Sequence, residues 1–402
     1  MHSRTTTLAI FGVFFFESSV IGQWIPRIPD IKTALALSDG ALGLALLSMP
    51  LGTLIGFSVA GKIIESTGLR TACRVFMPVW ALLFIGPALA QTFFQLSIAL
   101  VISGVAVGMI ETAMNTEAAR IEKASGKRLM SRCHGFWSLG TMIGALTGGA
   151  LAHWGLSTQT HFMIVMPLIG VCGFLAATAL PVLPSTAYTV LPDGVHDDPA
   201  QVSAPKAASK LIRLPERAIL LLCVMPLGIM MVEGAFIDWS AVFMRDIMAA
   251  GPWLIAITYS SFSIVMASVR LFGDTLANRY GDLLIVRVSG VAATLGIALF
   301  ALAPSTPWAF VAAALSGAGV AIVFPLAVTA AANRPGRNSA DSVAALNMIS
   351  FSAFLIAPPI IGFLSEAFGL RIALLALAPA AFMTFFLASE VRAVPAEPYG
   401  RD

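Results

Sequence analysis

Charged residues are scarce in this chain. Asp, Glu, Lys and Arg together make up 11% of its 402 residues, against about 25% in an average soluble domain. Apolar residues account for 58%, and an excess of this size indicates a surface that faces lipid rather than water. The net charge of +3 gives no indication of nucleic-acid binding.

Cysteine is also rare, and the four cysteines show no spacing typical of a disulfide framework or a metal site. We therefore expect them to be packing residues, and we expect neither a metal nor a cofactor. The sequence also lacks a Gly-x-x-x-x-Gly-Lys-Ser/Thr phosphate loop. Without that loop, or a soluble domain to hold it, an ATP-driven pump is excluded.

Long apolar runs recur along the whole chain, without the alternating pattern of a transmembrane barrel strand. A bilayer core about 30 Å thick requires about 20 mostly apolar residues per helical crossing. Helices also satisfy their own backbone hydrogen bonds in lipid. We therefore predict an all-α membrane protein with twelve spanning helices. The predicted spans are Thr5 to Trp24, Gly40 to Ala60, Val75 to Ala90, Phe93 to Asn115, Gly135 to Trp154, Phe162 to Leu183, Ala218 to Trp239, Trp253 to Phe272, Leu283 to Leu302, Trp308 to Ala332, Val343 to Leu364 and Ile372 to Leu387.

Basic residues are distributed unevenly between the two sides of the predicted helices. Of the 24 Lys and Arg residues, Arg27, Lys32, Arg245 and Arg371 fall in the odd-numbered loops, and the remaining 20 fall in the even-numbered loops and the two ends. Basic residues concentrate on the cytoplasmic side of membrane proteins. The distribution therefore predicts a multi-pass protein of the bacterial inner membrane with both termini in the cytoplasm.

A polar segment rich in proline interrupts the apolar pattern between residues 184 and 213, and this composition is typical of a linker. It divides the chain into a six-helix bundle over residues 1–183, a cytoplasmic linker, a second six-helix bundle over residues 214–390 and a cytoplasmic tail over residues 391–402. The two bundles also repeat one another. Glu17 matches Glu233 at an offset of 216, and Gly68 matches Gly281 at 213. This pattern predicts a pseudo-symmetric pair of parallel repeats.

The segment from Gly61 to Arg70 resembles the Gly-x-x-x-Asp-Arg-x-Gly-Arg loop between the second and third helices of the major facilitator superfamily. Glu65 stands for the family's Asp, and Ser66 replaces its Arg. A second copy from Gly273 to Gly281 keeps Arg-x-Gly and is one residue longer. The resemblance extends over essentially the whole chain and implies the major facilitator fold. The family builds gating salt bridges here, so the resemblance implies gating roles for Gly61, Glu65, Gly68, Arg70, Asp274, Arg279 and Gly281.

Four further segments look like one bacterial branch of that superfamily, the MosC-like and YbjJ-like permeases. By analogy with that branch, a polyol-like substrate is expected. The segments are Trp24 to Pro29, Met114 to Glu117, His134 to Gly140, and Glu233 to Ala235 with Asp238 to Ser240.

Three glutamates fall inside predicted spans: Glu17, Glu111 and Glu233. An ionisable side chain in a bilayer costs at least about 2.5–3.5 kcal/mol on insertion scales, so each requires a role. An apolar environment favours the protonated form of a carboxyl group, as a proton-coupling site requires. A similarity to fucose/proton symporters favours Glu17 with Glu111. Alternatively, Glu17 and Glu233 form a structural pair across the pseudo-symmetry axis, or the acids only lock helix packing.

Polar residues at helical spacing accompany these acids and could line a cavity for a hydroxyl-rich solute. Small and polar residues are also the ordinary means by which membrane helices associate, and the spacing does not distinguish the two. The candidate substrate-binding residues are Asn115, Trp137, Ser138, Thr141, Trp239, Asn347 and Ser350.

Charged pairs at the predicted helix ends are candidate gates. Outside, these are Arg27 with Asp30 and Arg245 with Asp246, together with Asp238 beside Trp239. Inside, they are Arg120 with Glu117 and Glu122, and Arg270 with Asp274. Incidental ion pairing among the cytoplasmic basic residues is the alternative.

Together these features predict a monomeric secondary transporter that works by alternating access. Proton-coupled symport of a small polar organic solute, of sugar or polyol type, is the favoured function. Proton-antiport efflux of drugs or metabolites is the alternative, and a non-transporting receptor on the same fold is less favoured. Gly273-Asp274 and Gly281-Asp282 are superficially similar to the Gly-Asp of membrane aspartyl proteases, but both pairs are already explained by the facilitator motif. We therefore expect no enzymatic activity.

Overall fold

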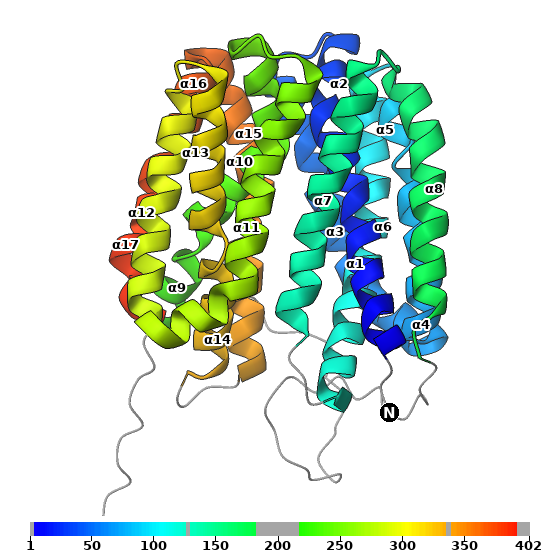
Figure 1. Cartoon of the computed structure of the whole chain (residues 1–402), viewed down its shortest axis with the longest axis vertical. Coiled ribbons are helices and arrows are strands. Elements are labelled where there is room, and N and C mark those ends of the chain that lie inside the picture. The colour runs from blue at the N-terminus through cyan, green and yellow to red at the C-terminus, as the bar shows by residue number, and fades with distance from the viewer. Residues whose placement is uncertain (1–3, 126–128, 182–216, 335–338, 392–402) are drawn as a thin grey trace, which may run out of the picture.

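The computed structural model describes residues 4–125, 129–181, 217–334 and 339–391, and these residues form helices and their connections without a strand (Figure 1). The predicted linker and, apart from Val391, the predicted tail lie outside the described residues. The division of the chain at these segments therefore stays a prediction.

The N-terminal half contains six membrane-crossing units. They are built from α1 (Arg4–Trp24), η1 (Ile25–Arg27), α2 (Ile28–Ala34), α3 (Asp39–Thr67), α4 (Leu69–Leu83), α5 (Gly86–Leu89), α6 (Phe93–Ser125), α7 (Met130–His153) and α8 (Thr158–Thr178).

The C-terminal half repeats this arrangement with more interruptions. Its elements are α9 (Arg217–Val224), α10 (Leu227–Val242), the π-helical turn η3 (Phe243–Ile247), α11 (Pro252–Tyr280), α12 (Asp282–Ala301), α13 (Thr306–Val320), α14 (Val323–Ala332), α15 (Ser339–Phe368), α16 (Leu370–Leu375), α17 (Leu377–Leu387) and η4 (Ala388–Val391).

Each of the twelve predicted spans coincides with a helical unit. Within the described residues, 11 helical stretches are long and apolar enough to cross a membrane. The twelfth unit is α7, whose 24 residues include Gly, Ser, Thr and His among the apolar residues. It lies beside α1 and α11 (Figure 1), and polar residues in its middle, such as Ser138 and Thr141, are buried against other helices. The prediction of an all-α membrane protein is confirmed.

Two bundles stand side by side in Figure 1, with α7 and α11 along their boundary. The end at which α1 begins is here called the termini face. The end that carries α2 and α16 is called the opposite face. Contacts of α7 with α11 and of α3 with α15 join the two bundles.

Backbone conformation confirms the internal repeat. Within the described residues, Ala36 and Ala249 are the non-glycine residues with positive φ, both at 50°, and they lie 213 positions apart. Gly68 and Gly281 have φ of 84° and 81° at the same offset. Glu17 and Glu233, in contrast, lie 216 positions apart. The N-terminal half therefore has three more residues between Glu17 and Ala36 than the C-terminal half has between Glu233 and Ala249, which is about one helical turn.

The two motif segments are largely helical, which corrects the expectation of a loop. Helix α3 continues to Thr67, and α4 begins at Leu69. The turn consists of Gly68 alone, whose φ of 84° and ψ of 150° suit glycine and disfavour other residues. Gly281 makes the same turn between α11 and α12. Because one glycine reverses the chain, no longer loop is needed.

Glycine lets α3 and α6 approach closely within the N-terminal half. A Cβ atom on Gly104 would lie 2.9 Å from the Cα of Gly52, and one on Gly56 would lie 3.0 Å from the Cα of Gly108. In lipid, helices associate through this kind of close backbone packing because no hydrophobic driving force operates between them.

We predict that Gly104→Ala destabilises the protein by about 1–3 kcal/mol, because the added methyl group would overpack a backbone contact. Thermal unfolding in detergent should show a lower midpoint for this variant. Gly251→Ala is the matched control, because a Cβ there meets nothing within 4 Å. Equal midpoints for the two variants would contradict the packing argument.

Candidate functional site

Glu17 lies in the buried middle of α1, with 1% of its surface exposed. The indole Nε1 of Trp137, on α7, donates a hydrogen bond of 2.9 Å to its carboxylate Oε2. The indole of Trp80, on α4, donates to the backbone carbonyl of Glu17 at 3.2 Å. Two tryptophans from different helices therefore hold this residue.

Glu111 lies on α6, close enough to Glu17 for the two carboxyl groups to interact electrostatically. Its backbone carbonyl accepts a 2.9 Å hydrogen bond from the amide of Asn115, one turn later. Asn115 is half-buried on the same helix. The structure therefore brings together Glu17, Glu111, Asn115 and Trp137, which the sequence analysis had assigned to proton coupling and substrate binding.

The other two α7 candidates, Ser138 and Thr141, are fully buried. Their hydroxyls donate to backbone carbonyls one turn earlier, Ser138 to His134 at 3.2 Å and Thr141 to Trp137 at 3.0 Å. Thr141 packs against α1, where its carbonyl oxygen would obstruct any side chain on Gly22. Its contacts are those of a packing residue, whereas Ser138 also takes part in contacts between the halves.

Glu233, the third acid, carries a counter-ion. Arg270 of α11 places its Nη2 atom 3.2 Å from the Glu233 Oε1 atom. The same guanidinium donates from Nε to the carbonyl of Ala321 at 3.2 Å and approaches the hydroxyl of Ser138 at 3.5 Å. Sequence analysis had grouped Arg270 with Asp274, four residues away on one helix. The structure instead gives it partners on α10, at the start of the α13–α14 break, and on α7.

Ala321 accepts this hydrogen bond because the helix is interrupted there. Helix α13 ends at Val320 and α14 begins at Val323. An interruption inside a membrane leaves backbone groups that other parts of the protein must satisfy. Arg270 supplies one such donor. The sequence signal for this role was an arginine inside a predicted span, but its partners lie 37 and 51 residues away.

Within the described residues, the remaining C-terminal candidates make no hydrogen bond with this ion pair. Ser350 donates to the carbonyl of Cys223 at 3.3 Å and joins α15 to α9. Asn347 is half-buried on α15. Trp239 is fully buried, and its indole nitrogen has no hydrogen-bond partner within the described part of the chain. Asp238 is partly buried on α10 and interacts electrostatically with Tyr259.

Charged residues link the two halves at the opposite face. Lys32 lies between two carboxylates, 2.5 Å from Asp39 and 2.7 Å from Asp246 of the other half. Arg245 approaches Asp30 across the same boundary at 3.6 Å. These cross-half pairs are here called the opposite-face latch. Sequence analysis identified Asp30, Arg245 and Asp246 as gate candidates but missed Lys32 and Asp39.

Arg27, the other gate candidate at this face, is tied mainly to its own half. It is 3% exposed, pairs with Asp30 at 3.0 Å, and donates to His161 at 3.1 Å and to the Leu156 carbonyl at 2.9 Å. A second cross-half contact joins Glu366 to the backbone nitrogen of Gly40 at 3.0 Å.

Near the termini face, the motif residues make few contacts. Glu65 is exposed, and Arg70 donates to the backbone carbonyl of Thr178 in its own half. Arg279 is exposed and lies over the ring of Tyr280, 5.4 Å from its centroid. The side chain of Asp274 is outside what the structure describes. The Arg120–Glu117 and Arg334–Glu390 ion pairs each join residues of a single half.

Comparisons with known proteins agree with this architecture. An uncharacterized transporter, y4wD of Sinorhizobium fredii, is 29% identical over 359 residues, which are 89% of this chain and 91% of the relative. The membrane protein MosC of Rhizobium meliloti is 26% identical over 376 residues, 92% of this chain and 86% of the relative. The branch resemblance seen in the motif segments is thereby confirmed.

The fold also matches a solved transporter structure. The E. coli fucose:proton symporter FucP superposes with a TM-score of 0.64 at 17% identity, covering 96% of this chain and 98% of that protein. This likeness shows the fold alone. A family model described as the Major Facilitator Superfamily matches residues 6–354. The chain therefore belongs to the Major Facilitator Superfamily of membrane transporters.

Proposed function

We propose that this transporter is a proton-coupled symporter of a small polar organic solute, of sugar or polyol type, working by alternating access. The observation that carries the proposal is the meeting of Glu17 and Glu111 from two helices of one half. Two carboxyl groups in an apolar environment cannot both be ionised without a large electrostatic cost. At least one of them is therefore expected to hold a proton.

Trp137 supplies the link between this acid pair and a solute. Its indole donates to a carboxyl oxygen of Glu17, and such a bond is stronger to an ionised carboxylate than to a protonated carboxyl group. The ring of Trp137 is half-buried. If its position changes when Glu17 is protonated, proton binding is coupled to the surface that the ring presents to a solute. FucP, a fucose:proton symporter of the same fold, supports this proposal by analogy.

Glu233 is better suited to another role than proton coupling. Its ion pair with Arg270 compensates its charge, so protonation is not required to keep it inside the bilayer. We therefore assign coupling to Glu17 and Glu111.

The opposite-face latch supports alternating access. The described ion pairs between the halves lie at that face, and the described ion pairs Arg120–Glu117 and Arg334–Glu390 near the termini face stay within one half. Rocking of two repeats around a central site would break the first group and leave the second intact. We propose that the structure represents the state closed at the opposite face, which the basic-residue distribution assigns to the outside.

We predict that Glu17→Gln and Glu111→Gln each abolish proton-driven accumulation of substrate while exchange of substrate across the membrane persists. Neutral glutamine keeps the shape of the side chain but cannot release a proton. Accumulation and exchange would be measured in liposomes with and without a pH gradient. Asp282→Asn is the matched control, because this exposed acid at the start of α12 lies outside the pair and is not one of the gate candidates.

Normal accumulation by both Gln variants would refute the coupling assignment. Substrate release driven by an inward proton gradient, instead of uptake, would indicate the antiport alternative.

We predict that Lys32→Gln opens the opposite face, because Asp39 and Asp246 then repel each other without their shared cation. The probe is the labelling rate of a cysteine at Ser260, a buried position on α11, in a Cys172→Ser background. The rate should rise at least about fivefold, the effect of about 1 kcal/mol. Lys62→Gln, an exposed lysine on α3, should leave the rate unchanged. An unaltered rate in Lys32→Gln would show that the latch does not hold this face closed.

We predict that a cysteine at Ser66, exposed near the termini face, is protected from membrane-impermeant reagents in intact cells. A cysteine at Gln91, exposed between α5 and α6, should react. The positive-inside distribution is the reason for both expectations. The reverse labelling pattern would overturn the proposed orientation in the inner membrane.

A further inference from the structure

The Arg270–Glu233 ion pair is not sealed inside one half. Its side chains are 15% and 12% exposed, respectively. Arg270 also approaches Ser138 of the N-terminal half and lies close enough to His134 to interact electrostatically. The pair therefore lies where the two halves meet.

One face of α11 points toward this boundary. Tyr259, Ser263 and Arg270 follow one another at intervals of four and seven residues, which places them on a single helical face. Ser263 donates to the carbonyl of Ser138 on α7 at 2.9 Å. Tyr259 and Arg270 consequently face the N-terminal half on either side of this contact along the axis of α11.

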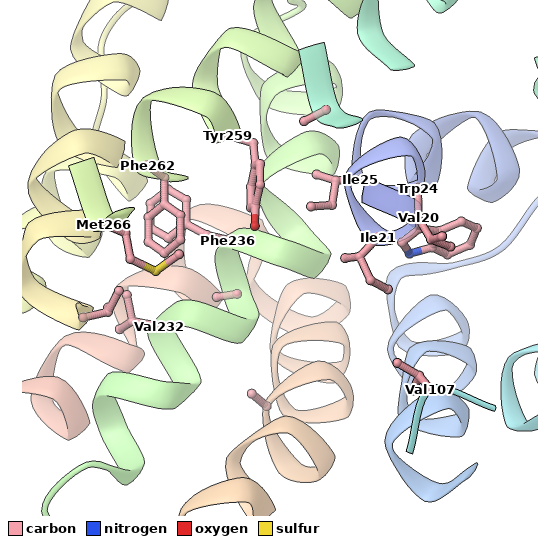
Figure 2. Packing of buried hydrophobic residues seen from close by; sticks show 14 of the residues in the cluster. Val20, Ile21, Trp24, Ile25, Val107, Val232, Phe236, Tyr259, Phe262 and Met266 are labelled. Atoms are coloured by element: carbon pink, nitrogen blue, oxygen red, sulfur yellow. The ribbon is translucent and has the colours of Figure 1, made fainter. Parts of the chain in front are cut away.

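Tyr259 has a hydroxyl group without a partner. The residue is fully buried, and within the described residues its hydroxyl oxygen makes no hydrogen bond. It interacts electrostatically with Glu233, Arg270 and Asp238. Figure 2 shows the residue between the stacked rings of Phe236 and Phe262 on one side and Ile21 of α1 and Ile25 of η1 on the other. Buried hydroxyls are normally hydrogen-bonded, so the hydroxyl of Tyr259 is available to a ligand that reaches this boundary.

We infer that Arg270, Glu233 and Tyr259 form the binding site for two neighbouring hydroxyl groups of an uncharged polyol. The guanidinium donates to one hydroxyl oxygen, the carboxylate accepts the hydrogen of the next, and the phenol of Tyr259 completes the set. This inference rests on the proposed function, because it names the substrate class and the residues that bind it.

Charge balance favours a diol over an ion. The arginine and glutamate are 3.2 Å apart and neutralise each other. An anionic solute that took Arg270 would leave Glu233 without its counter-ion, and a cationic solute that took Glu233 would do the same to Arg270. An uncompensated charge in a poorly hydrated site is strongly unfavourable. A vicinal diol offers both an acceptor and a donor, so both charges stay satisfied.

The test is equilibrium binding to the purified full-length protein in detergent, by calorimetry and thermal shift, without any proton gradient. The probes are xylitol, sorbitol and myo-inositol, together with glucose, glucuronate and glucosamine. The last three share one sugar ring and are neutral, anionic and cationic, respectively. We expect binding by at least one uncharged probe and weaker or no binding by glucuronate and glucosamine. Binding only by a charged probe, or by none of the uncharged probes, would overturn the inference.

Two variants then locate the site for the probe that binds. The double variant Arg270→Gln with Glu233→Gln leaves no unpaired charge and should weaken binding at least about tenfold, because charge-assisted hydrogen bonds are lost. Tyr259→Phe removes a hydroxyl without a protein partner, so it should keep the thermal midpoint of the protein and weaken binding about threefold to tenfold. Arg334→Gln with Glu390→Gln, a remote ion pair, is the control.

Unchanged affinity in Tyr259→Phe would refute the site even if the double variant did not fold. Binding in detergent is measured at one pH without a proton gradient, so failure of this inference is distinguishable from failure of proton-driven accumulation. Polyol binding with no proton dependence of uptake would contradict the coupling proposal alone. Proton-coupled uptake of a charged solute would contradict the diol site alone.

Discussion

An ionisable side chain inside a bilayer must find compensation within the protein, and this constraint organises the centre of the structure. Glu17 receives an indole hydrogen bond from Trp137, and Glu233 receives the guanidinium of Arg270. The two solutions differ in kind. An indole is a neutral hydrogen-bond donor, whereas a guanidinium also carries a positive charge that compensates the charge of its partner.

This difference gives distinct chemistry to two halves that have the same backbone fold. Positive-φ residues recur at an offset of 213, so these turns have been retained in both copies. The polar residues have not been retained. Helix α6 carries Glu111, whereas the corresponding region of the second copy contains the break between α13 and α14, whose carbonyl is bound by Arg270. Proton exchange and ligand binding can therefore occupy different halves and remain joined through α7.

Helix α7 connects these regions because it contacts both α1 and α11. Trp137 reaches Glu17 in its own half, and the next residue, Ser138, contacts Arg270 and Ser263 of the other. Adjacent residues on a helix point in directions about 100° apart, so one turn of α7 can face both sites. Its polar composition follows from this position between two bundles.

The sequence by itself determined the helices, their number, the repeat and the family, because apolar runs and single glycines act locally. It also indicated Glu17, Glu111 and Trp137, since a polar residue inside an apolar run is conspicuous without any structure. Only the tertiary structure decided the partners. The salt bridge between Arg270 and Glu233, the position of Lys32 between two carboxylates, and the packing role of Thr141 all depend on helices that are distant in sequence and adjacent in space. Spacing along one helix carries no information about which neighbour it will face, because that choice is made by the packing of the two bundles.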